Sequence, residues 1–425
     1  MTHRWFKGLV VAVVMAILVL SSTAGLAKAP VTIRALFMEQ ASYSAEDIKA
    51  MTRDFEAKNP GIKVELTFVP FEALHDKTVA SGAAGVATYD VVLVDSQFPP
   101  EFATAGFVLD VTKRVPAEYK KGVFAPVMDM VEFRGKIYGL PWVLDTKYFF
   151  YNTDMLKKAG FTEPPKTWDE AIDQAKAIKA KGLVKYPFVW SWAQAEALVC
   201  DYIQLTHAFG GTILDQNDNP AFHRGGGLEA LKFMVRTLDE GLTNPASIEF
   251  LEEDVRKTFS AGDAAFALNW VYMYNLANDP KEAKVAGKVG MTISPGTKGI
   301  KSASVNGSML LSVMKNSKHP NEAFKYIAYL TSRPVQEKYA ALSLPIWTAS
   351  YEDPKLVKEL GTLIAAAKEQ YKYMHSKPKV VWYNEMSTVL QVALQNALTK
   401  KMTPEKALDD AAKKVAAIKA KYAKK

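Results

Sequence analysis

The chain has 425 residues, of which 49% are hydrophobic and 23% charged, and its formal net charge is +8. This length excludes a single hydrophobic core, because cores stop growing beyond about 250–300 residues and longer chains divide into domains. The only cysteine is Cys200, which excludes an intramolecular disulfide. We therefore expect two domains that are held together by packing.

Residues 1–29 have the pattern of a secretory signal peptide. Arg4 and Lys7 make a basic start, an apolar run follows from Leu9 to Leu20, and Ala27-Lys28-Ala29 offers small residues to a signal peptidase. The apolar run is well short of the roughly 20 residues that span a bilayer. No cysteine lies near the cleavage site, so lipid attachment is not expected. The sequence predicts a freely diffusing periplasmic protein.

The charge balance of the mature chain is mild. Cleavage after Ala29 removes three basic residues and no acidic one, which leaves 50 basic against 45 acidic residues. The lysines are scattered along polar helix faces, and there is no basic stripe with interleaved aromatic residues. Nucleic-acid binding is therefore not expected.

The mature chain begins with alternating strand and helix patterns. An apolar strand at 31–38 precedes a helix that Ser44 caps. Residues 62–68 alternate between apolar and polar, as in a half-exposed strand, and a second helix follows. The unbroken apolar run 91–94 is typical of a central parallel strand. The order β-α-β-α-β predicts a doubly wound α/β sheet.

Polar residues follow two of these strands. Ligands of doubly wound sheets bind outside the carboxyl ends of the strands. Glu39 and Gln40 come after the first strand, and Asp95 and Gln97 after the third. These are candidate binding residues; the alternative is that Asp95 only shapes a turn, and periodicity does not decide between the two.

A second region of alternating elements begins near the middle of the chain. The turn 134–136 leads into a predicted strand at 137–141, and an aromatic strand follows at 148–151. Thr167 caps a later helix, and Thr403 caps the last one. No flexible linker separates the two regions, so we expect short crossover segments between two lobes.

Signatures of enzymes and metal sites are absent from the sequence. The histidines of the mature chain are isolated, and no zinc, phosphate-loop or nucleophile motif is complete. We therefore expect no catalytic residue, no metal and no cofactor.

Tryptophans near polar or acidic residues suit a polyhydroxylated ligand. A sugar has apolar C–H faces that lie against aromatic rings, and hydroxyl groups that donate to carboxylates. Trp142, Trp190, Trp192, Trp270 and Trp382 are of this kind. The alternative for each is a place in the core. Trp190 and Trp192 share a face if their segment is extended.

An ordered series of short segments carries a family resemblance. They are 55–64, 89–94, 102–109, 138–141, 150–152, 165–170, 259–266 and 323–330. In this order they resemble the extracellular solute-binding protein family typified by maltose-binding protein, over essentially the whole mature chain. The resemblance implies a carbohydrate-binding protein of an ABC transporter.

The resemblance also implies the architecture and the partners. It implies a type II periplasmic-binding-protein fold, in which two doubly wound α/β lobes flank a cleft and close about a hinge. The amino-terminal lobe is expected at 30–143 plus 301–343, and the carboxyl-terminal lobe at 144–300 plus 344–425. A monomer that delivers a small carbohydrate or sugar alcohol to inner-membrane permease subunits is expected.

Several binding residues follow from the resemblance by position. Asp145 falls where the family has a sugar-binding glutamate, and Trp382 resembles a sugar-stacking tryptophan. Tyr272 matches another stacking tryptophan, but Trp270 lies two residues earlier, so both stay candidates. Gly307 matches a glycine-containing turn that lines the cleft. At the first lobe, either Asp95 or Gln97 makes the contact.

The whole predicted ligand-binding set combines these two sources. It consists of Glu39, Gln40, Tyr43, Asp95, Gln97, Asp145, Trp190, Trp192, Trp270, Tyr272, Asn306, Gly307 and Trp382. One alternative keeps the fold and changes the cargo to a polyamine, a peptide or a phosphorylated polyol. Another is a secreted glycoside-active enzyme, because paired carboxylates and aromatic rings also form catalytic clefts.

Overall fold

The computed structural model describes residues 29–39 and 42–424. Residues 1–28 of the predicted signal peptide and Gln40 of the predicted site lie outside the described residues. Within the described part of the chain, no helix has both the length and the apolar character needed to cross a bilayer.

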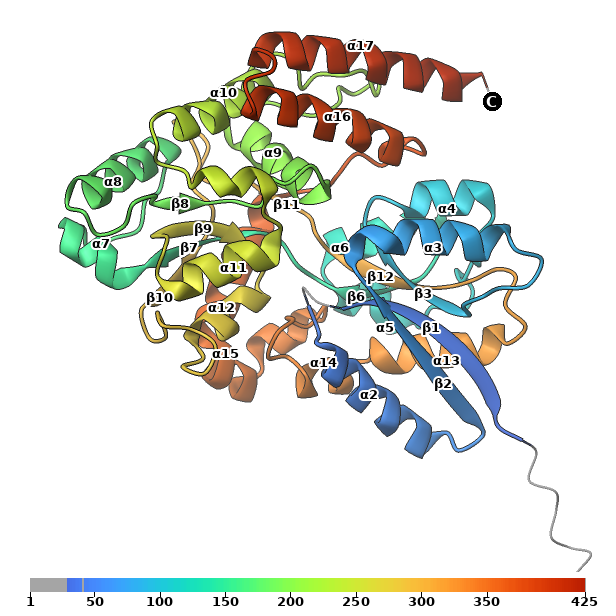
Figure 1. The fold of residues 1–425 in the computed structure, drawn as a ribbon. Coiled ribbons are helices and arrows are strands. Elements are labelled where there is room, and N and C mark those ends of the chain that lie inside the picture. The colour runs from blue at the N-terminus through green and yellow to red at the C-terminus, as the bar shows by residue number, and fades with distance from the viewer. Residues whose placement is uncertain (1–28, 40–41, 425) are drawn as a thin grey trace, which may run out of the picture.

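A five-stranded sheet forms the centre of the first lobe (Figure 1). Its order is β2-β1-β3-β12-β6, where β1, β2 and β3 are parallel and β12 runs antiparallel to both of its neighbours. The strands are β1 (Val31–Met38), β2 (Ile62–Val69), β3 (Val91–Asp95), β6 (Leu140–Val143) and β12 (Met309–Val313). The predicted strands at 31–38, 62–68 and 91–94 are thus confirmed.

Helices flank this sheet. They are α2 (Ala45–Lys58), α3 (Phe71–Ala83), α4 (Pro99–Ala105), α5 (Ala117–Gly122), α6 (Ala125–Val131), α13 (Pro320–Leu330) and α14 (Arg333–Lys338). The predicted cap of α2 is confirmed: the Ser44 hydroxyl accepts from the Asp47 amide, and the Asp47 carboxylate accepts from the Ser44 amide. This capping box satisfies two backbone donors that the first helical turn leaves free.

A four-stranded sheet forms the centre of the second lobe. Its order is β10-β7-β9-β8, with strands β7 (Tyr148–Asn152), β8 (Phe188–Val189), β9 (Phe266–Asn269) and β10 (Val289–Thr292). The α-helices of this part are α7 (Thr153–Ala159), α8 (Trp168–Ala180), α9 (Glu196–Ala208), α10 (Gly226–Asp239), α11 (Glu252–Ala261), α12 (Tyr272–Asn278), α15 (Pro354–Gln370), α16 (Tyr383–Leu398) and α17 (Pro404–Ala423). Short 3-10 helices lie at Pro245–Glu249, Thr348–Glu352 and Tyr371–Tyr373.

Three chain segments lie side by side between the two sheets (Figure 1). The short strands β11 (Ser304–Val305) and β13 (Met374–His375) pair in parallel. Thr146, between β6 and β7, forms a bridge with Asn306, between β11 and β12. The chain therefore passes between the lobes in a bundle of backbone hydrogen bonds, the arrangement expected of a hinge.

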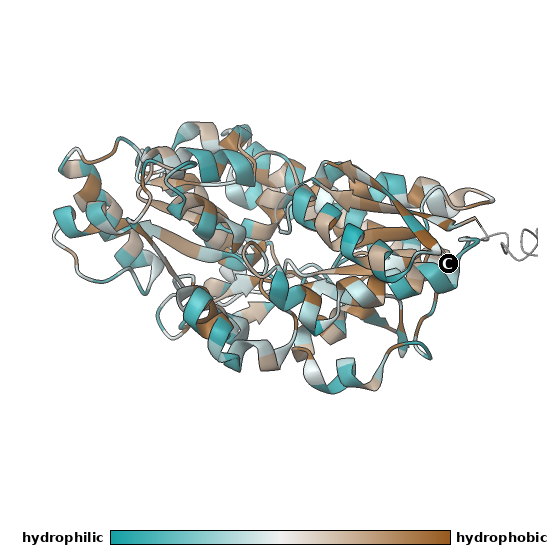
Figure 2. Cartoon of the chain, turned by 90° about the horizontal axis from the view of Figure 1, so that it is seen from below, coloured by the Kyte–Doolittle hydropathy of each residue, from teal (hydrophilic) through white to brown (hydrophobic). Residues whose placement is uncertain are grey.

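Each sheet has its own apolar core. The first core gathers β1, β3 and β12 with α2 and α13. In the second lobe, Phe149 packs on one face of β7 and Phe150 on the other, because successive strand residues point to opposite faces. Figure 2 shows hydrophobic strands inside both lobes and hydrophilic residues on the outer helices.

The predicted strand at 137–141 is wrong in detail, because it divides into two strands. β5 (Lys136–Ile137) pairs with β4 (Glu132–Phe133) in a hairpin, and β6 starts at Leu140. The hairpin turns at Arg134 and Gly135, both with positive φ. Gly139 then lies so close to β12 that a Cβ atom would be 2.6 Å from the Leu311 carbonyl oxygen, which explains the glycine between the strands.

Candidate functional site

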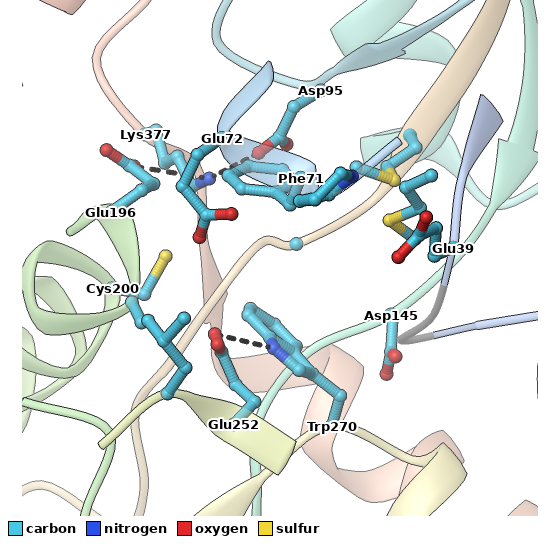
Figure 3. Close-up of a pocket in the computed structure, with 16 residues that line it drawn as sticks. Glu39, Phe71, Glu72, Asp95, Asp145, Glu196, Cys200, Glu252, Trp270 and Lys377 are labelled. Carbon is cyan, nitrogen blue, oxygen red and sulfur yellow. Dashed lines mark hydrogen bonds and ion pairs between the residues drawn. The ribbon is translucent and has the colours of Figure 1, made fainter. Parts of the chain in front are cut away.

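A cavity of about 210 Å³ lies between the two lobes (Figure 3). Sixteen residues line it: Met38, Glu39, Pro70, Phe71, Glu72, Asp95, Asp145, Glu196, Ala197, Cys200, Leu251, Glu252, Trp270, Gly307, Met309 and Lys377. They come from both sheets and from the segments that join them, so a molecule bound here contacts both lobes.

The first lobe contributes the carboxyl ends of its parallel strands. Glu39 follows β1, and Asp95 ends β3, whose residues are all buried. Phe71 and Glu72 begin α3 directly after β2. Parallel strands bring these ends to one edge of the sheet, which is why residues far apart in sequence meet at one wall of the cavity.

The second lobe contributes the amino-terminal turns of two helices and one aromatic ring. Glu196 begins α9 and Glu252 begins α11, where a negative charge interacts favourably with the helix dipole. Trp270 follows β9, and its indole Nε1 donates to the Glu252 carboxylate at 3.2 Å. That bond fixes the ring orientation and leaves the half-buried ring at the cavity wall.

Asp145 is a buried acid at the cavity, in the segment between β6 and β7. Only 3% of its surface is exposed, and its carboxylate accepts from the amides of Thr146, at 2.8 Å, and Val271, at 3.4 Å. Burial raises the pKa of Asp145 to about 8, because desolvation of the charge outweighs these two hydrogen bonds. The side chain can accept a hydrogen bond from a ligand, and in its protonated form it can also donate one.

Lys377 is a buried cation that joins the two lobes. Its Nζ donates to the Asp95 carboxylate at 3.0 Å and to the Gln97 side-chain oxygen at 3.1 Å, and it lies 3.4 Å from a Glu196 carboxylate oxygen. The carboxylates of Asp95 and Glu196 and this ammonium group meet at one end of the cavity (Figure 3). They raise the pKa of Lys377 against the effect of its burial, so the amine stays charged.

A second buried ion pair, between Lys147 and Asp201, lies near the Trp270 ring. The Lys147 and Asp201 side chains have no exposed surface, and their charged atoms are 2.6 Å apart. Lys147 also donates to the Ser191 hydroxyl at 3.0 Å, and its Nζ is 5.2 Å from the centre of the Trp270 ring. A cation at this distance is attracted by the face of an indole.

Five of the predicted binding residues line the cavity together: Glu39, Asp95, Asp145, Trp270 and Gly307. Gln97 and Asn306 are buried beside lining residues without lining the cavity themselves. The Gln97 oxygen holds Lys377, and Asn306 precedes Gly307.

The other described candidates pack in the protein interior. Trp190 and Trp192 do share a face, with ring centres 4.9 Å apart in a stacked arrangement, but both are buried in the core of the second lobe. Trp382 packs in the same core. Tyr43 packs against Trp142 at 4.9 Å in the first lobe. Tyr272 is buried in the first turn of α12.

Sequence reasoning missed several lining residues, chiefly Lys377, Glu196, Glu252, Phe71 and Glu72. A signal existed for the glutamates, because each lies in the first turn of a helix, where acidic residues are enriched. No local pattern marks Lys377. Within the described residues, no group of three or more histidine, cysteine or acidic side chains is arranged to hold a metal ion.

The two α/β lobes and the cavity between them define a two-lobe solute-binding protein. Residues 38–337 match the sequence model of one family, the bacterial extracellular solute-binding proteins. The chain belongs to this family, whose members bind solutes for ABC transporters.

Individual relatives agree with that assignment. A Deinococcus radiodurans protein named "Probable ABC transporter-binding protein" is 30% identical over 382 residues, which cover 86% of this chain and 89% of the relative. The maltose-bound MalE3 structure of T. maritima is 31% identical, with a TM-score of 0.85 over 91% of this chain and 99% of that chain. A solute-binding protein of Thermotoga lettingae bound with alpha-D-tagatose is 27% identical, with a TM-score of 0.83 over the same shares.

Proposed function

We propose that this protein captures a small carbohydrate or sugar alcohol in the cavity between its lobes and delivers it to the permease of an ABC importer. The observation that carries this proposal is the pairing of one aromatic ring with buried acids: Trp270 and Asp145 line the same cavity. An indole face suits the C–H surface of a sugar, and a carboxylate accepts bonds from hydroxyl groups.

Capture is coupled to closure in this proposal. Asp95 and Glu39 belong to the first lobe, whereas Trp270 and Glu252 belong to the second. A solute that contacts both walls binds the closed arrangement more tightly than an open one and shifts the population toward closure. The permease then distinguishes loaded from empty protein by its shape.

The same proposal includes the cellular setting. The protein acts in the periplasm as a monomer, and it needs no cofactor, metal or nucleic acid. It does not transform its ligand, and the family supports this point because its members bind solutes. Two relatives of known structure, bound to maltose and to alpha-D-tagatose, support the carbohydrate class.

Two measurements test the proposal. Mass spectrometry of small molecules released from the denatured protein identifies a retained cargo, and titration calorimetry against maltose, tagatose, mannitol and ribitol measures affinity. We expect dissociation constants at or below the micromolar range for at least one neutral sugar or polyol. A retained amino acid or peptide, with no binding of any sugar or polyol, would refute the proposal, and turnover of a bound glycoside would favour an enzyme instead.

A further inference from the structure

Acidic side chains dominate the wall of the cavity. Among the described residues that line it, six carry carboxylates: Glu39, Glu72, Asp95, Asp145, Glu196 and Glu252. Lys377 is the only lysine or arginine among those sixteen residues. Even without Asp145, whose raised pKa favours the neutral acid at pH 7, the lining has five carboxylates against one ammonium group.

The one lining cation is fully occupied by the protein. An ammonium group has three N–H donors and no acceptor. The Lys377 ammonium has the Asp95 and Gln97 oxygens within 3.1 Å and the Glu196 oxygen at 3.4 Å, which together match its three donors. Its side chain is 2% exposed. A bound anion would have to displace one of these internal partners to reach it.

The other nearby lysine, Lys147, is also unable to pair with an anion in the cavity. Lys147 lies behind Trp270 with no exposed side-chain surface, and its amine is held by Asp201 and Ser191. It does not line the cavity. An anion that is buried without a cationic or hydrogen-bonding partner loses its hydration and gains no interaction in return, so its binding is unfavourable.

Asp145 determines which hydrogen-bonding groups a ligand should present to this part of the cavity. Its carboxyl group is buried, belongs to a residue that lines the cavity and receives only two backbone N–H groups, both at Oδ1. A carboxylate accepts up to about four hydrogen bonds. A hydroxyl or ammonium donor of a ligand can bond to the carboxyl oxygen that these amides leave free. A phosphate or carboxylate would instead lie among the acidic side chains of Glu39, Glu72, Glu196 and Glu252, which line the same cavity.

From these contacts we infer that the site selects its solutes by charge. It accepts neutral and amine-bearing polyhydroxylated molecules and rejects their phosphorylated or carboxylated counterparts. This inference rests on the proposed function and narrows it to one charge class. In this inference, Lys377 pairs with the carboxylates of the protein and does not bind an anionic group of the ligand.

Two sets of matched ligands test the inference by titration calorimetry at physiological ionic strength. One set is sorbitol, its 1-amino analogue glucamine and sorbitol 6-phosphate; the other is glucose, glucosamine and glucose 6-phosphate. We expect each phosphate ester to bind at least 100-fold more weakly than its neutral parent, and each amine at least as tightly as the parent. A phosphate ester within threefold of its neutral parent would overturn the inference while leaving the proposed function intact. Binding of the esters alone would overturn both.

A charge reversal at the wall supplies a second test. Glu72 lines the cavity and is exposed, so Glu72→Lys replaces a carboxylate of the wall with an amine. Glu118→Lys is the matched control, because Glu118 is an exposed residue of α5 and does not line the cavity. We expect Glu72→Lys to lower the ratio of the ester and parent dissociation constants at least tenfold. An equal change of that ratio in both variants would contradict a local origin of the selectivity.

Discussion

Gly307 lies directly against the indole ring of Trp270: a Cβ atom on Gly307 would be 2.2 Å from Cζ3 of that ring. The ring is held from another side by the bond from its Nε1 to Glu252. Gly307 also donates its amide to the Asp145 carbonyl at 3.0 Å. Because Gly307 has no side chain, the Trp270 ring can pack directly against its backbone. This contact fixes the position of the ring relative to Asp145.

Gly307→Ala is expected to weaken ligand binding at least tenfold. The added methyl group forces the ring or the 304–309 segment to move, and a displaced platform no longer faces the ligand. Titration calorimetry with the best neutral ligand measures the change. Gly61→Ala is the matched control, because a Cβ atom there meets no atom within 4 Å, and its affinity should stay within twofold of the wild-type value. Equal affinities for Gly307→Ala and the wild type would remove Trp270 from the binding surface.

Asp145→Asn is expected to stabilise the protein against unfolding at pH 8 and to have a smaller effect at pH 5. The pKa of Asp145 is raised from 3.8 to about 8 on folding, so the folded protein binds the extra proton between these values and loses stability as pH rises through them. One pKa unit corresponds to about 1.4 kcal/mol, so the two pH values should differ by up to about 4 kcal/mol. Thermal unfolding at pH 5 and pH 8 measures this difference.

The same variant should bind a neutral polyol more weakly, because an amide NH2 group replaces one of the two carboxyl oxygens that accept hydrogen bonds. A loss of about tenfold or more is expected from calorimetry at pH 8. Unchanged affinity would place Asp145 outside the ligand contacts, and equal stabilisation at both pH values would contradict the raised pKa.

Part of the first wall of the cavity was predictable from local patterns. The apolar runs that form β1 and β3 end at definite residues, so Glu39 and Asp95 follow from the rule that ligands bind at the carboxyl ends of parallel strands. The doubly wound arrangement followed from the same alternation, although β12 and β6 complete the sheet in antiparallel directions.

The second wall depends on long-range packing that no local pattern describes. Lys377 pairs with Asp95 across 282 positions of the sequence. The alternation of Trp190 and Trp192 correctly placed both rings on one face, yet it contains no information on whether that face meets ligand or core; here Trp168 packs against Trp190. Trp270 and Tyr272 separate because β9 ends at Asn269 and α12 begins at Tyr272.

Lys377→Met is expected to destabilise the protein by about 3–5 kcal/mol, because it leaves the carboxylates of Asp95 and Glu196 without their cation. Chemical denaturation measures the free energy of unfolding. Lys379→Met is the matched control: Lys379 pairs with Asp129, but both side chains are partly exposed, so a loss below about 1 kcal/mol is expected. The double variant Lys377→Met with Asp95→Asn should be less destabilised than the sum of the single changes. Strict additivity would contradict the coupling of Lys377 to Asp95.

His207 and His375 should make the protein less stable in acid. Their rings stack at 3.8 Å with an interplanar angle of 5°, which joins α9 to β13 beside the segment that carries Lys377. Burial, together with the charge of the neighbouring ring, lowers the pKa of His207 to about 3, and burial also lowers the pKa of His375. Asp215 and Asp218 line the same surface hollow, and the pKa of His207 is low despite these acids.

The direction of this pH dependence follows from the difference between the pKa values of the folded and unfolded states. The unfolded histidine takes up a proton below about pH 6.5, whereas folded His207 stays neutral to about pH 3. The contribution of His207 to stability is therefore complete above pH 6.5 and is lost as pH falls. The loss from His207 should reach about 2 kcal/mol at pH 5. His207→Phe keeps a flat ring and removes the proton site, and unfolding titrations at pH 7 and pH 5 should therefore show a smaller difference in this variant than in the wild type. His375→Phe should act in the same direction, and wild-type pH dependence in both variants would show that the stacked pair does not link folding to protonation.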